Sequence, residues 1–121
     1  MNVDKDVVIT ALAVENWRLV RTLMRVAREL PLSAQERTAA VARYADRKLT
    51  NLLADAGMQL ETFDGRSFDA SLPVSPVNIG DFESEAGLII QETLEPAVLR
   101  DGRVAAWGKV ILSEGSGVSR D

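Results

Sequence analysis

The chain has 121 residues, of which 46% are hydrophobic and 26% charged, with a net charge of −4. This size supports one domain, or one small domain with a helical appendage, and the acidic balance argues against nucleic acid as a partner. Cysteine and histidine are both absent, which excludes disulfides, thiolate metal sites and the commonest general base. No apolar run approaches the roughly 20 residues that cross a bilayer. We therefore expect a cytoplasmic, non-enzymatic protein with no cofactor, no metal and no membrane association.

Residues 4–30 are expected to form one amphipathic helix that ends at Pro31. Apolar residues recur in it at spacings of three, four and seven, among them Leu12, Leu19 and Val26. This apolar face has two interpretations: it packs against the next helix, or it is a helix–helix dimer interface. Because an uncovered stripe of this length favours aggregation, we expect a homodimer through Leu12, Leu19 and Val26.

A second helix is expected to begin with Ser33 as its N-cap. Ser33 and Glu36 have the spacing of a capping box, in which each side chain bonds the backbone N–H of the other residue. Gly57 is placed to end this helix. Few residues join the two helices, which favours an antiparallel hairpin. Residues 1–57 are therefore predicted to be a helical hairpin and the dimerisation region.

Short apolar runs between turn residues predict a β-module over residues 58–114, followed by a flexible tail at 115–121. Asp101 and Gly102 lie between two such runs and predict a tight hairpin with a type I′ turn. The predicted fold class is α+β: an N-terminal helical hairpin followed by a small, mostly antiparallel β-module.

Two further features of this module have local interpretations. Gly108 interrupts a strand pattern, which indicates a bulge or a bend. Residues 81–86 are expected to form one helical turn capped by Asp81.

The residues that could carry chemistry are few, and we expect no catalytic residue. The nearest approach to a carboxylate cluster consists of Asp64, Asp69, Asp81, Glu83 and Glu85. A carboxylate-based hydrolase would need such a group, and it is the third interpretation of the chain. The spacing matches no metal-binding loop, and a solvated turn is the preferred interpretation. Trp107 has two interpretations, a side chain that covers the module or an exposed interface anchor.

Residues 57–69, GMQLETFDGRSFD, resemble the entry to the β-domain of the GrpE nucleotide exchange factors. In that family a helix ends near a glycine, a short strand follows, and a G-x-x-F-D segment comes next, which Gly65 to Asp69 fits. Residues 102–110, GRVAAWGKV, are similar to a later run of the family, with Arg103, Val104 and Val110 matching. The resemblance covers residues 57–112, roughly half of the chain.

The chain departs from the family pattern at several positions. Ala70 follows F-D where a proline is usual, and a His-Glu pair that follows in the family is absent. Ala106 and Trp107 replace an arginine and a proline, and Leu94–Pro96 stands where Gly-Tyr is common. Residues 75–85 form a longer segment than in the family, and its very long N-terminal coiled-coil helix has no counterpart here.

The resemblance implies a co-chaperone that docks as a dimer on the ATPase domain of a DnaK-type chaperone and promotes nucleotide exchange. No catalytic residue is required for this activity. We expect the partner-binding surface at Phe68, Asp69, Arg103 and Trp107, with Arg103 exposed near the hairpin tip. The alternative is a non-enzymatic scaffold or assembly subunit that binds another protein through the β-module.

Overall fold

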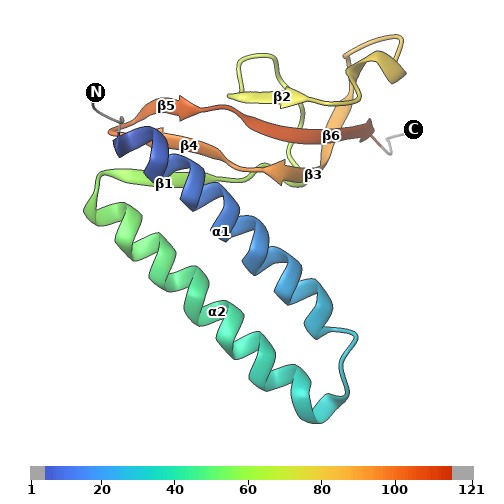
Figure 1. The fold of residues 1–121 in the computed structure, drawn as a ribbon. Coiled ribbons are helices and arrows are strands. Elements are labelled where there is room, and N and C mark those ends of the chain that lie inside the picture. Colours follow the sequence, from blue (N-terminus) through green and yellow to red (C-terminus); the bar gives the residue numbers. More distant parts are fainter. Residues whose placement is uncertain (1–4, 116–121) are drawn as a thin grey trace. The chain divides into compact units, whose positions relative to one another are not determined.

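The fold consists of two helices followed by six strands, and the chain divides into two compact units (Figure 1). The computed structural model describes residues 5–115. The helical unit is Met1–Gln59 and the β-unit is Leu60–Asp121. This arrangement confirms the predicted α+β fold. Of the predicted tail, residues 116–121 lie outside the described residues, as does residue 4 of the first predicted helix.

The helical unit contains α1 (Lys5–Ala27) and α2 (Leu32–Asp55), which lie side by side as an antiparallel hairpin (Figure 1). The short connection leaves the last carbonyls of the α1 segment without helical donors. In the connection itself, the Gln35 side-chain amide donates to the Arg28 and Leu30 carbonyls at 3.1 and 2.8 Å. At the far end Gly57 follows α2 with φ of +74°, which confirms the predicted glycine stop.

The predicted start of the second helix was wrong. The helix begins at Leu32, its N-cap is Pro31, and no side chain caps it. The Pro31 carbonyl accepts the N–H groups of Ala34 and Gln35 at 2.8 and 3.1 Å, so the first helical turn begins at Pro31 and already includes Ser33. Ser33 therefore lies inside the helix, where its hydroxyl cannot act as the N-cap.

The three residues predicted for the dimer interface lie largely outside the packing between α1 and α2. Leu12, Leu19 and Val26 are 64%, 69% and 46% exposed. The buried residues of α1 are instead Ala13, Val20 and Ala27, each one position further along the chain. Dimerisation through the exposed stripe stays a prediction.

The β-unit and its border contain two three-stranded sheets. One sheet has the order β1-β4-β5, and the other has the order β2-β6-β3. The strands are β1 (Met58–Glu61), β2 (Val74–Pro76), β3 (Leu88–Glu95), β4 (Ala97–Arg100), β5 (Arg103–Ala106) and β6 (Gly108–Glu114).

Pairing within these sheets is antiparallel between β3 and β6 and between β4 and β5, and parallel between β2 and β6. The chain changes sheet three times: in the loop between β1 and β2, at Pro96 between β3 and β4, and at Trp107 between β5 and β6. The predicted hairpin is confirmed: Asp101 and Gly102 join β4 to β5 with φ of +51° and +82°. These positive angles at both central positions are what a type I′ turn requires.

The core of the β-unit is built from aliphatic side chains and one phenylalanine. Its buried members are Phe63, Val74, Leu88, Ile90, Ala97, Val110 and Leu112, with Phe68, Leu72, Ile79 and Phe82 packed against them. Four of the buried residues come from β3 and β6: Leu88 and Ile90 from β3, and Val110 and Leu112 from β6. Each pair lies at alternate positions, which is the period of two expected for a half-buried strand.

Two polar side chains replace missing strand partners beside this core. The buried Thr93 hydroxyl accepts the Phe63 N–H at 2.9 Å. The Asn78 amide accepts the Leu112 N–H at 2.9 Å and donates to the Leu112 carbonyl at 3.0 Å, which prolongs the β2–β6 pairing beyond Pro76. Each satisfies backbone groups that would otherwise be buried without a partner.

The helical turn predicted for residues 81–86 was also wrong. A 3-10 turn, η1, spans Ile79–Asp81 and ends there, because Phe82 adopts an extended backbone with ψ of 144°. Within residues 5–115, no helix is both long and apolar enough to cross a membrane.

Candidate protein-binding site

Strand β5 is the most exposed strand of the β-unit. It lies at the end of its sheet and pairs with β4 on one side. Arg103, Val104 and Ala105 are exposed and Ala106 is half-buried. Val104 lies opposite Leu99, one pair beyond the turn, so the alternation of an antiparallel ladder directs its backbone N–H and C=O away from β4. An open edge with an apolar side chain is a surface that proteins usually protect or use for binding.

Trp107 follows β5 directly and is 57% exposed. Its neighbour Gly108 is buried, and the Gly108 N–H donates to the Pro73 carbonyl at 2.9 Å. A Cβ atom at Gly108 would lie 2.8 Å from the Glu95 carbonyl oxygen and 2.9 Å from the Ala97 nitrogen. The sheet changes at Pro96 and Trp107 are therefore in direct contact. Because the backbone at Gly108 is fixed in this way, the Trp107 ring is presented to solvent from a rigid base.

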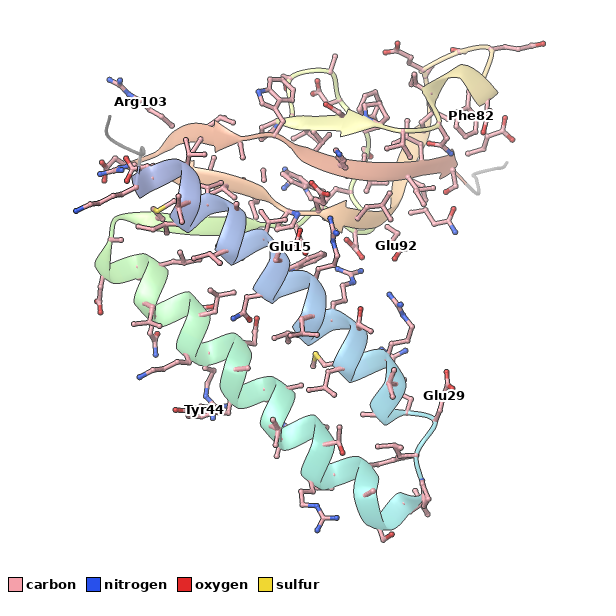
Figure 2. The ribbon with its side chains drawn as sticks, in the orientation of Figure 1. Glu15, Glu29, Tyr44, Phe82, Glu92 and Arg103 are labelled. Carbon is pink, nitrogen blue, oxygen red and sulfur yellow. The ribbon has the colours of Figure 1, made fainter. Side chains whose placement is uncertain are left out.

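Arg103 occupies the opposite end of β5 from Trp107. It is exposed and directly follows the turn, as the sequence predicted. They are four positions apart along an extended chain, roughly 13 Å, so they form the ends of an exposed strip rather than one cluster. An open hollow at the hairpin is lined by Arg100, Asp101, Arg103, Val104 and Ala105. Figure 2 shows Arg103 at one end of the β-unit and Phe82 at the other.

Phe68 and Asp69 lie on the loop between β1 and β2. Phe68 is half-buried against the core, and its N–H donates to the Leu88 carbonyl at 2.9 Å. The structure thus gives Phe68 a packing role and leaves its partner-binding role a prediction. Asp69 is exposed, and its carboxylate accepts the Ser71 N–H at 2.8 Å. The Ser71 backbone and side-chain hydrogen bonds lower the pKa of Asp69 below its ordinary value of 3.8.

The five acidic residues considered for hydrolysis do not form a metal site within the part of the chain that the structure describes. No group of three or more Asp, Glu, His or Cys residues there has the arrangement that could hold an ion. Asp64 has a structural task instead, because its carboxylate accepts the Thr93 N–H at 2.9 Å. Asp69 likewise accepts the Ser71 N–H, as described above.

Sequence reasoning missed Val104 as a candidate contact, although it is 45% exposed between Arg103 and Trp107. The sequence pattern indicates only that Val104 belongs to an apolar strand and to the GrpE-like run. The two alanines that follow Val104 could have indicated its exposure, because a strand with small side chains has little apolar surface to bury. The candidate site is therefore the exposed strip of Arg103, Val104 and Trp107.

Comparison with known proteins adds no relative to this picture. The chain matches no protein-family model, no curated protein and no solved structure.

Proposed function

We propose that the chain is a GrpE-like co-chaperone or adaptor that binds the ATPase domain of a DnaK-type chaperone through its β-unit and promotes nucleotide exchange. The observation that carries the proposal is the exposed strip of β5, with Trp107 at one end and Arg103 at the other. Trp and Arg are the residues most enriched among those that dominate binding energy at protein interfaces. This strip lies within residues 102–110, the later of the two segments that resemble the GrpE β-domain.

The proposed action needs binding only. An exchange factor that binds the nucleotide-open conformation of a chaperone more tightly than the closed one shifts the population toward the open state. The size of the shift is set by the ratio of the two affinities and not by the affinity itself. Nothing in this action requires a nucleophile or a general base, and the chain contains neither histidine nor cysteine.

The test measures release of a fluorescent ADP from the ATPase domain of a DnaK-type chaperone, with and without the purified chain. We expect faster release with the wild type. Trp107→Ala should weaken binding by about thirtyfold or more, the effect of losing a residue worth 2 kcal/mol. Because Trp107 is more than half exposed, the free energy of unfolding of the Trp107→Ala variant should differ little from that of the wild type.

Val77→Ala is the matched control, since Val77 is also 57% exposed and lies elsewhere in the β-unit. It should leave both binding and release unchanged. Equal binding by the wild type and the Trp107 variant would overturn the assignment of the strip. Absence of any effect of the wild type on ADP release would overturn the exchange activity.

The second candidate is a scaffold or assembly subunit that uses the same strip. It is favoured by Trp107 itself, which stands where the GrpE pattern has a proline. In that case the chain would leave ADP release unchanged, and a different purified protein partner would bind in a manner that depends on Trp107.

A further inference from the structure

Strand β5 presents an open backbone edge at Val104. Arg100 pairs with Arg103 beside the two-residue turn, and the next pair along the ladder is Leu99 with Val104. Because hydrogen-bonded and non-hydrogen-bonded pairs alternate, the Val104 N–H and C=O point to the side of β5 where its sheet ends. No turn, loop or cap hydrogen bond within residues 5–115 uses either group. Such a pair of groups is a template for a further strand.

A bulge limits this edge to a short stretch. In the register of β4 with β5, Ala105 has no partner and lies between the paired positions Val104 and Ala106. A bulge bends its strand and interrupts the regular ladder. An incoming strand can therefore pair with the backbone at Val104, and its further contacts must come from side chains, above all from the exposed Arg103 beside it.

The charges of the β-unit indicate which side chain would meet this edge. Residues 60–115 contain ten acidic residues and four basic ones. Three of the basic side chains form ion pairs with carboxylates: Arg66 with Glu61 at 3.3 Å, Lys109 with Glu95 at 3.9 Å, and Arg100 with Asp101 at 3.8 Å. Arg103 is the fourth, and it forms no ion pair with any described residue. The uncompensated positive charge of an otherwise acidic unit thus lies at the open edge, which favours an anionic occupant.

We propose that the partner segment bound by the exposed strip is extended and adds to β5 as a further strand, with an apolar residue opposite Val104 and an acidic residue opposite Arg103. The source of the segment rests on the proposed function, and the mode of binding is new. Side chains alternate between the two faces of a strand, so Arg103 offers a charge on one face and Val104 an apolar group on the other. A segment with alternating acidic and apolar residues matches both faces. Its main-chain bonds supply affinity and its alternate side chains supply specificity.

Two substitutions at Val104 separate backbone pairing from side-chain contact. Val104→Pro removes an N–H that the fold does not use, and proline is tolerated at such a position of an edge strand. Val104→Ala is the matched control, because it shortens the side chain and keeps the N–H. In titration calorimetry with the purified ATPase domain of a DnaK-type chaperone, Val104→Pro should bind about tenfold more weakly than Val104→Ala, the effect of about 1.4 kcal/mol for one hydrogen bond. Equal binding by two folded variants would overturn the strand pairing.

Amide hydrogen exchange of the wild type, followed by NMR, reads the same contact with no substitution. The Val104 N–H should exchange rapidly in the free chain and become protected with saturating ATPase domain. The Ile90 N–H, which donates to the Arg66 carbonyl at 2.8 Å inside the fold, should be protected in both states. A Val104 N–H that exchanges equally fast in both states would overturn the proposal. Protection in the free chain that rises with its concentration would also overturn it, because a second copy would then be the occupant.

A synthetic peptide of alternating valine and glutamate tests the stated chemistry apart from the chaperone. It should protect the Val104 N–H, whereas a matched peptide of alternating valine and lysine should not. Arg103→Glu should reverse this preference. Lys109→Glu makes the same charge change at another exposed position of the β-unit and should leave the preference as it is in the wild type. An equal response to both peptides, or to neither, would overturn the stated chemistry.

The two arms separate this inference from the proposed function. A chain that prefers the glutamate peptide but does not bind the ATPase domain would refute the proposed function and support the edge pairing. A chain that binds the ATPase domain without protecting the Val104 N–H would support the proposed function and refute the edge pairing.

Discussion

Replacing Gly108 with alanine tests the rigid base beneath Trp107. The added Cβ would lie 2.8 Å from the Glu95 carbonyl oxygen and 2.9 Å from the Ala97 nitrogen, both of which are backbone atoms. No flexible side chain can move aside, so β6 must shift away from the sheet change at Pro96. Shifts of this kind in a packed interior cost about 1–3 kcal/mol. The cost is steric, because Gly108 does not adopt a left-handed φ.

The same shift would lengthen the hydrogen bond from the Gly108 N–H to the Pro73 carbonyl, now 2.9 Å, which is worth about 1 kcal/mol. We therefore expect Gly108→Ala to lower the free energy of unfolding by about 2–4 kcal/mol. Gly80→Ala is the matched control, because a Cβ there meets no atom within 4 Å and Gly80 also lacks a left-handed φ. Its effect should stay within about 0.5 kcal/mol.

The assay is urea denaturation followed by tryptophan fluorescence. Trp17→Phe in all variants leaves Trp107 as the single reporter, so the signal comes from the β-unit. A urea midpoint of Gly108→Ala well below that of Gly80→Ala would support the close approach of Gly108 to the backbone at Pro96. Equal midpoints would refute it and would remove the reason for the outward position of Trp107.

Two further predictions concern polar contacts of the β-unit. Asn78→Ala leaves the N–H and C=O of the buried Leu112 without their side-chain partner, and should cost about 2–4 kcal/mol in urea denaturation; a loss below 0.5 kcal/mol would contradict this. Asp69 has a folded-state pKa below its ordinary 3.8 because Ser71 donates to it, so its contribution to stability is complete above pH 3.8 and is lost as the pH falls through the folded-state pKa. Asp69→Asn should flatten the dependence of the urea midpoint on pH in that window, and an unchanged dependence would show that the Ser71 contact does not stabilise the fold.

The parts of the fold that could be predicted from the sequence are those set by local backbone chemistry. Asp101 and Gly102 specify their turn because few residues accept a positive φ. Gly57 ends its helix for the same reason. The capping box at Ser33 failed because Pro31, two residues earlier, already provides the first helical carbonyl. Two local signals competed there, and the hydrogen bonds of the backbone decided between them.

The division into two sheets could not be predicted, because it depends on contacts between distant residues. The sequence predicts a bulge or bend at Gly108. The structure shows that the backbone at Gly108 also lies against the backbone at Pro96, where the chain passes from one sheet to the other. Thr93 and Asn78 carry no local pattern, since their backbone partners are 30 and 34 residues away. Of the candidate site, the exposure of Arg103 followed from the adjacent turn. The exposure of Val104 did not, because it depends on β5 lying at the end of its sheet.

Some paired strands of the β-unit are close in sequence and others are far apart, and this difference affects the order in which the β-unit folds. The β4–β5 hairpin is closed by two residues, whereas β2 meets β6 across 34 residues, as the contact between Asn78 and Leu112 shows. Chain entropy makes the short closure fast and the long one slow, because distant segments must meet before any contact stabilises them. The hairpin should therefore form early on the folding pathway, and the parallel docking of β2 should come late. The strand that carries Arg103 and Val104 thus belongs to the part of the β-unit expected to nucleate the rest.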